Sequence, residues 1–177
     1  MRPILAHRVV QRYMTIIASD HFEMKGAIMF SSSAVQSAQK KGEEILANLV
    51  GQEAADEMIA ARKQRDGNKA HITVAGPKDA KDAVAERAKK DGSSKGAAEK
   101  ALKEELASMR GGSFTVKGLG HAESGGKEAY FVVIDWSEGE KIREQLGLDP
   151  RGQDFHITVG FKGGDVHGVP KNRVVAR

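Results

Sequence analysis

The tetrapeptide His-Ile-Thr-Val occurs twice in this chain, once beginning at His71 and once at His156. Each copy alternates polar and apolar side chains among β-branched residues, a pattern that predicts a β-strand. Residues two apart in a strand share one face, so His71 and Thr73 point the same way. The same holds for His156 and Thr158. Each copy therefore presents one imidazole and one hydroxyl group on a common surface.

The opposite face of each copy is apolar. Alternate residues around the motifs form two apolar sets, namely Ala70, Ile72 and Val74, and Phe155, Ile157, Val159 and Phe161. We expect these side chains to anchor each strand in the core, with Phe161 on the same face as Ile157 and Val159. Two such strands brought face to face would surround one pocket with two histidines and two hydroxyl groups.

That set of groups suits acid–base chemistry at phosphorus. A histidine pKa of roughly 6.5 lets an imidazole give or take a proton near neutral pH. Phosphodiester hydrolysis needs a base to activate the attacking oxygen and an acid to protonate the leaving oxygen, and two imidazoles supply both. The hydroxyl groups of Thr73 and Thr158 can hydrogen-bond the non-bridging oxygens, where charge develops. This chemistry requires no metal or other cofactor, and the sequence leaves open whether His71 or His156 is the acid.

The segments before the first motif combine strand and helix patterns. Phe22–Phe30 is expected to be a strand, preceded by a shorter one at Met14–Ala18. Residues 31–33 are serines that offer hydroxyl groups to cap a helix, and apolar residues then recur at helical spacing from Ala34 to Arg65. Gly51 is expected to divide this stretch into two helices.

A charged segment, Lys78–Arg110, lies between the two motifs. Its many Ala, Lys and Glu residues predict helix, and Asp91–Ser94 interrupts them, so we expect two helices joined by a flexible elbow. Such charge usually belongs to a solvated helical face. The segment holds no aromatic residue that could stack on a base. We interpret it as a lid or as a surface for a partner.

The second half of the chain repeats the pattern of the first. Ser113–Leu119 and Lys127–Trp136 are predicted to be strands joined by a hairpin turn. Ser137 with Glu140 matches a capping box, which predicts a helix that runs to about Leu146.

Both halves therefore have the order strand or hairpin, helix, turn and His-x-Thr strand. This repeat predicts a single domain over residues 1–177, made of two lobes related by a pseudo-twofold axis. Each lobe contributes one His-x-Thr strand. The expected fold class is α+β, with antiparallel sheets and outer helices around a central cleft.

Composition limits the classes of function. The 177 residues carry a net charge of +4, a mild excess that favours anionic partners such as nucleotides or RNA. The absence of cysteine excludes disulfides and thiol nucleophiles. No apolar run approaches the roughly 20 residues of a membrane span, and no secretory signal is evident. The basic start resembles a mitochondrial presequence, but an ordinary basic segment explains it better. We expect a cytoplasmic monomer that does not bind membranes.

Paired His-x-Thr strands, one in each half of a duplicated α+β domain, resemble the two-histidine (2H) phosphoesterase superfamily. That superfamily includes 2′-5′ RNA ligase-like proteins and cyclic phosphodiesterases. The segments Phe155–Phe161 and Asp165–Val169 are similar to its Swiss army knife branch. The resemblance implies a bilobal fold with a central cleft and metal-independent hydrolysis of 2′,3′-cyclic phosphate RNA ends, 2′-5′-linked or cyclic nucleotides.

The resemblance also implies which residues are catalytic. The positions that match its motif are His71, Thr73, His156 and Thr158. The expected partners are RNA ends or small cyclic nucleotides as substrate. The segment Lys78–Arg110 has no counterpart that we can align, so it bears on substrate choice.

Four further residues are candidates for binding substrate. Tyr130 and Trp136 could stack on a base, although aromatic residues in strands more often lie in the core. His167 and Lys171 follow the second motif closely and could reach a phosphate, although a solvated tail explains them equally well. Asp165, His167 and His121 offer metal ligands, but their spacing matches no recognised pattern, so no metal site is expected.

Two other classes of function remain open. The first is a nucleotide- or RNA-binding module that uses the same cleft without turnover. The second is a structural or partner-binding domain that uses the helices of Lys78–Arg110 as its surface.

Overall fold

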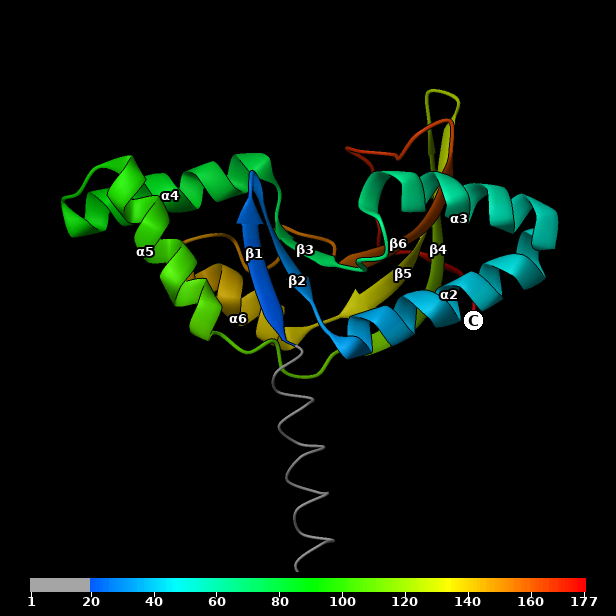
Figure 1. Ribbon diagram of the computed structural model, residues 1–177, viewed down its shortest axis with the longest axis horizontal. Coiled ribbons are helices and arrows are strands. Elements are labelled where there is room, and N and C mark those ends of the chain that lie inside the picture. Colours follow the sequence, from blue (N-terminus) through cyan, green and yellow to red (C-terminus); the bar gives the residue numbers. More distant parts are fainter. Residues whose placement is uncertain (1–19) are drawn as a thin grey trace, which may run out of the picture.

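The computed structural model describes residues 20–177. The strand predicted at Met14–Ala18 and the basic start of the chain lie outside these residues. The described part is a mixed α+β fold with two antiparallel sheets, as the sequence predicted (Figure 1). None of the helices in this part is long and apolar enough to span a membrane.

The first sheet contains three strands, β1 (His21–Lys25), β2 (Ala27–Ser31) and β3 (Ile72–Ala75), in the order β1-β2-β3. The segment predicted as one strand is therefore a hairpin. It turns at Gly26, whose φ of 72° lies in the left-handed region that glycine adopts readily. The first His-Ile-Thr-Val motif enters β3 at Ile72, and β3 is an edge strand of this sheet.

Helices α2 (Ser33–Val50) and α3 (Gln52–Asp66) follow the hairpin and are divided at Gly51, as predicted. Ser32 caps α2, because its hydroxyl oxygen accepts a hydrogen bond from the backbone N–H of Val35 at 3.2 Å. The two helices do not cover the first sheet. Both pack instead on β6 of the second sheet.

Helices α4 (Pro77–Asp91) and α5 (Lys95–Ser108) form the charged segment between the motifs, and they meet at an elbow that includes Gly92. Helix α4 packs on β2 and β3, and α5 packs on β1. The pair lies at one end of the molecule, while α2 and α3 lie at the other (Figure 1). The buried residues of α4 and α5 include Ala80, Ala83, Ala98, Leu102 and Leu106. The segment is therefore part of the folded core and not only a solvated face.

The second sheet has four strands in the order β6-β5-β4-β7. They are β4 (Thr115–Ser124), β5 (Lys127–Asp135), β6 (His156–Lys162) and β7 (Val174–Ala176). The second His-Ile-Thr-Val motif begins β6, again an edge strand. Strand β7 was not expected from the basic tail. It pairs with β4, so residues 163–173 connect the β6 edge of the sheet to the opposite edge.

Helix α6 (Ser137–Gln145) joins β5 to β6. The capping box predicted for it is wrong. Trp136 is the N-cap residue, so Ser137 already lies in the first turn, and the cap makes no side-chain hydrogen bond. The predicted end of the helix near Leu146 is confirmed, because Leu146 is its C-cap.

The two sheets meet where the edge strands β3 and β6 contact each other. One large apolar cluster runs through both, with Phe30, Ile72, Val132 and Ile157 among its members. Both His-x-Thr strands are therefore fixed on one continuous core. Their polar faces are left at the junction of the two sheets.

Candidate active site

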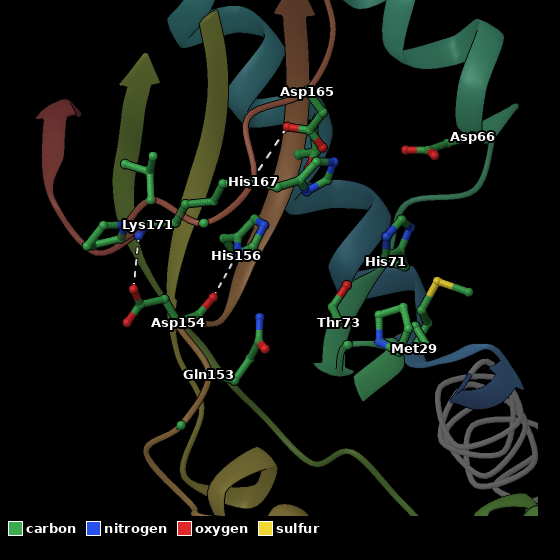
Figure 2. Close-up of a pocket in the computed structure, with 18 of the residues that line it drawn as sticks. Met29, Asp66, His71, Thr73, Gln153, Asp154, His156, Asp165, His167 and Lys171 are labelled. Atoms are coloured by element: carbon green, nitrogen blue, oxygen red, sulfur yellow. Dashed lines mark hydrogen bonds and ion pairs between the residues drawn. The ribbon is translucent and has the colours of Figure 1, made fainter. Parts of the chain in front are cut away.

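A cavity of about 660 Å³ lies at this junction, and both motifs line it. Figure 2 shows His71 with Thr73 on one side of the cavity and His156 on the other. The remaining lining comes from β2, the end of α3, the start of α4, and β6 with the segments on either side of it. It comprises Ala27, Met29, Arg65, Asp66, Gly76, Pro77, Gly152, Gln153, Asp154, Thr158, Asp165, His167, Gly168, Val169, Pro170 and Lys171.

Strand alternation directs the functional side chains into this cavity. Ile72 and Val74 are fully buried, whereas His71 and Thr73 on the other face are only partly buried. His71 lies one residue before the first residue of β3, so its backbone precedes the regular ladder.

Each motif strand also contains an irregularity immediately after its threonine. Thr73 pairs with Met29 and Ala75 with Ile28, which leaves Val74 without a partner in the ladder. On β6, Val159 is skipped between Thr158 and Gly160 in the same way. Both motifs therefore contain a β-bulge at their valine, a feature that bends a strand and changes the direction of its side chains.

The bulge on β6 corrects the expectation for Phe161. After the extra residue the alternation shifts by one, and Phe161 pairs with Ala129. The side chain of Phe161 therefore lies on the face of the sheet opposite to Ile157 and Val159. Phe161 therefore packs in a second, smaller apolar cluster with Phe131. Ile157 and Val159 remain in the main core.

His156 is held in one tautomer. Its Nδ1 lies 2.7 Å from the backbone carbonyl oxygen of Asp154. A carbonyl oxygen can only accept, so Nδ1 carries the proton and Nε2 keeps its lone pair in the neutral ring. Burial lowers the pKa of His156 to about 4, and the positive charge of Lys171 acts in the same direction. His156 is therefore neutral at physiological pH in the unliganded protein.

His71 has a different electrostatic environment. Burial lowers its pKa, and the carboxylates of Asp66 and Asp165 oppose that shift, whereas Arg65 adds to it. The positive form of His71 in turn lowers the pKa of His156. The two imidazoles thus interact electrostatically across the cavity.

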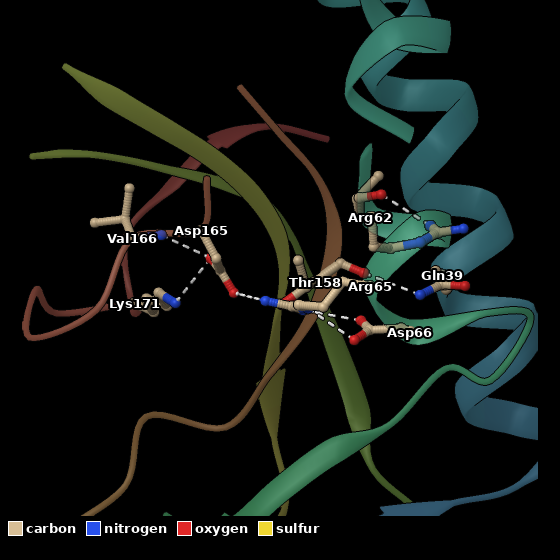
Figure 3. A network of polar contacts seen from close by, with 9 residues as sticks. Gln39, Arg62, Arg65, Asp66, Thr158, Asp165, Val166 and Lys171 are labelled. Atoms are coloured by element: carbon tan, nitrogen blue, oxygen red, sulfur yellow. Dashed lines mark hydrogen bonds and ion pairs between the residues drawn. The ribbon is translucent and has the colours of Figure 1, made fainter. Parts of the chain in front are cut away.

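A chain of charges joins α3 to the segment after β6 (Figure 3). Arg65 donates from Nε and Nη2 to both carboxylate oxygens of Asp66, at 2.7 and 2.8 Å, and from Nη1 to Asp165. The other oxygen of Asp165 lies 3.6 Å from Nζ of Lys171. Burial raises the pKa of Asp165, but the positive charges of Arg65 and Lys171 have the larger combined effect. The pKa of this carboxyl is therefore lowered overall.

Two of the four candidate binding residues line the cavity, and two do not. His167 and Lys171 are in its lining, and Lys171 is nearly buried, with 7% of its surface exposed. Tyr130 and Trp136 are buried and lie outside the lining. Trp136 packs against Phe30 and donates from Nε1 to a backbone carbonyl at 2.7 Å. The expectation that these two rings stack on a base in the cavity is therefore corrected: both are core residues.

Several lining residues were not named as site residues from the sequence. Asp154 precedes His156 by two residues, so strand alternation alone could have placed it beside that histidine. Asp165 was considered as a metal ligand and as part of the segment similar to the Swiss army knife branch, but not as a site residue. Arg65 and Asp66 end a helix of the first half and reach the second motif only through tertiary packing, for which the sequence carries no local signal.

One group of potential metal ligands occurs among the described residues. It consists of His121, Glu123 and Glu128 on the β4–β5 hairpin, outside the central cavity. The imidazole of His121 lies 3.1 Å from Glu128 and 3.7 Å from Glu123, so a hydrogen bond across the hairpin to Glu128 explains the group.

The cavity thus combines the imidazoles and hydroxyl groups of both motifs with the imidazole of His167 and a nearly buried lysine, a set able to transfer protons around a bound phosphate. Comparison with known families agrees: a family model described as Swiss Army Knife, 2H phosphoesterase domain matches residues 35–167. The chain belongs to the 2H phosphoesterases, which supports a phosphoesterase activity. Within that superfamily it belongs to the Swiss Army Knife family. No significant match was found among curated proteins or among solved structures.

Proposed function

We propose that this protein is a metal-independent phosphodiesterase. Its substrates are 2′,3′-cyclic phosphate RNA ends, 2′-5′-linked nucleotides or cyclic oligonucleotides. The observation that carries the proposal is that His71 and His156 line the same cavity, each beside a threonine of its own motif. A phosphodiester in this cavity has an imidazole on each side, which is what in-line displacement at phosphorus needs.

The hydrogen bond from His156 to Asp154 supports a division of roles. A neutral ring whose Nε2 lone pair is free is a proton acceptor, so we assign His156 as the general base that activates the attacking water. Burial lowers the pKa of His71, and the nearby carboxylates of Asp66 and Asp165 oppose that shift. His71 is assigned as the general acid that protonates the leaving oxygen, once a bound anion has raised its pKa.

Lys171 is the proposed phosphate ligand. The guanidinium of Arg65 is engaged by Asp66 and Asp165, so its charge is already compensated. Lys171, by contrast, has three donors on Nζ and one ion pair at 3.6 Å. Gly76 and Pro77 at the N-terminal end of α4 also line the cavity, where the helix dipole favours negative charge.

The test is turnover of a panel of small substrates by the purified protein in the presence of EDTA. The panel comprises adenosine 2′,3′-cyclic phosphate, a 2′-5′-linked diadenylate and an oligoribonucleotide with a 2′,3′-cyclic end. We expect hydrolysis of at least one of them, lost in His71→Ala and in His156→Ala. His121→Ala is the matched control, because this histidine lies outside the cavity.

A second candidate function uses the same cavity without turnover. A low histidine pKa also suits a pocket that only binds a neutral or weakly anionic ligand. Tight binding of a cyclic nucleotide with no product after prolonged incubation would support that binding module and contradict the enzyme.

A further inference from the structure

Two buried arginines contact the backbone of the motif strands, one arginine for each strand. Arg62 donates from Nη1 to the carbonyl oxygen of Val159 at 2.8 Å. Arg143 donates from Nη1 to the carbonyl oxygen of Val74 at 2.7 Å. These valines are the bulged residues of the two motifs, so each arginine holds the irregular point of one strand.

Each guanidinium is also fixed by a carboxylate. Arg62 lies 2.9 Å from Glu43 of α2, and Arg143 lies 2.9 Å from Asp79 of α4. The side chains of Arg62 and Arg143 are 3% and 2% exposed, so both are almost completely buried. On β6 the side chain of Gln39 adds a hydrogen bond of 2.9 Å to the carbonyl oxygen of Thr158. Figure 3 shows Arg62 and Gln39 reaching that strand from their helices.

The two contacts cross between the halves of the chain. Arg62 belongs to α3, the helix before the first motif, yet it holds the strand of the second motif. Arg143 belongs to α6, the helix before the second motif, yet it holds the strand of the first. Neither arginine lines the cavity, so neither contacts a ligand there.

Bulges determine where the neighbouring side chains point. A shift of one residue in a strand turns its side chains to the opposite face, and a bulge is the place where such a shift begins. Both motif strands are edge strands, so each has a ladder partner on one side only. A side-chain donor at the bulged carbonyl therefore supplies a constraint that the sheet itself does not.

We propose that Arg62 and Arg143 are a crossed pair of positioning residues. Arg62 fixes the bulge of β6 and so the direction of His156 and Thr158, while Arg143 fixes the bulge of β3 and so the direction of His71 and Thr73. The proposal rests on the proposed function only in treating the two histidines as the reacting pair.

The test measures the ring-nitrogen shifts and the pKa of each histidine separately in the unliganded protein. Protein labelled with ¹⁵N in its histidines is prepared with Arg62→Lys or Arg143→Lys, and the ring nitrogens are followed by NMR through a pH titration. We expect Arg62→Lys to change the shifts and pKa of His156 and to leave those of His71 nearly unchanged. Arg143→Lys is expected to do the reverse. Arg87→Lys is the matched control, because Arg87 pairs with Asp91 and Glu105 outside the cavity.

Two milder variants cover the case in which an arginine variant does not fold. Glu43→Gln and Asp79→Asn leave each arginine in place and remove the carboxylate that fixes it. They are expected to give the same crossed pattern with smaller changes. Folded variants in which both histidines keep their wild-type shifts, or in which each variant disturbs both histidines equally, would overturn the proposal.

Turnover gives a second and separable readout. If the panel above yields a substrate, Arg62→Lys and Arg143→Lys are expected to lower kcat by about 10- to 100-fold, because small misplacements of catalytic groups cost that much. KM should change little, since neither residue contacts substrate. Loss of activity only in proportion to unfolded protein would indicate a purely structural role. If no substrate is found for the wild type, the proposed function fails while the crossed NMR pattern remains testable.

Discussion

His156 is a histidine that the fold keeps neutral. Its ring donates to Asp154, and burial together with Lys171 lowers its pKa to about 4. Asp165 opposes this shift, and His71 across the cavity adds to it. A group with these properties accepts a proton readily only when an anion enters beside it, which couples proton transfer to substrate binding.

This environment makes stability depend on pH. In the unfolded chain, His156 takes up a proton as the pH falls below 6.5. In the folded protein the ring stays neutral until the pH falls to about 4. Its contribution to stability is therefore complete above pH 6.5 and is lost as the pH falls towards 4, by at most about 3 kcal/mol. Urea unfolding of the wild type and of His156→Asn should show a stability difference that shrinks over this range. A difference that does not vary with pH would show that His156 does not have a lowered pKa in the folded protein.

Lys171→Met removes the proposed phosphate ligand but retains an apolar chain of similar length. Loss of one charge-assisted hydrogen bond corresponds to about 10- to 100-fold in affinity, so KM should rise by that amount. Lys162→Met is the control, because Lys162 ends β6 outside the cavity. Equal KM values for the two variants would show that Lys171 does not bind the substrate phosphate.

Helix packing on the motif strand depends on glycines at two close approaches. A Cβ on Gly42 of α2 would lie 2.7 Å from Cγ2 of Val159, and one on Gly160 of β6 would lie 2.9 Å from Cβ of Met58. These contacts bring α2 and α3 close enough for Gln39 and Arg62 to reach the backbone of the strand. The glycines thus link helix packing to the shape of the cavity.

A pair of glycine substitutions tests this packing. Gly42→Ala should lower the free energy of unfolding by about 1–3 kcal/mol, because the added methyl overlaps two valines. Gly96→Ala in α5 meets nothing within 4 Å and should raise it by about 0.5–1 kcal/mol, as expected for an open helical position. Thermal or urea unfolding measures both. Effects of the same sign would contradict the observed packing.

Local patterns predicted most of these elements. The break at Gly51, the elbow before α5 and the alternation that directs His71 into the cavity follow from residue type and spacing. The bulge that moves Phe161 to the other face was not predictable, because Val159 looks like any strand residue and only its tertiary partners make it irregular. The core position of Trp136 depends likewise on packing against Phe30.

The charged helices α4 and α5 are part of the core of the whole molecule. Leu102 and Leu106 are buried, and Asp79 holds the arginine that contacts β3. We expect Leu102→Ala to lower the free energy of unfolding by about 2–5 kcal/mol. A loss near zero in urea unfolding would show that α5 is a detachable surface element and would revive the partner-binding interpretation.

The crossed contacts also bear on the proposed duplication. Each half supplies one edge strand with its bulge and one helix whose arginine holds the strand of the other half. This reciprocity supports our proposal that the two sheets are lobes of one duplicated domain. It also explains why neither half would form the cavity alone.

In the proposed mechanism, His71 and His156 act on one phosphorus atom. The most direct test is the turnover of the best substrate by the wild type, His71→Gln, His156→Gln and the double variant. Each single variant should lose about 10²- to 10⁴-fold, and the double variant should lose little more than the worse single one, because the two groups act as a unit. Full turnover in either single variant, or losses that multiply in the double variant, would contradict joint action of the two histidines.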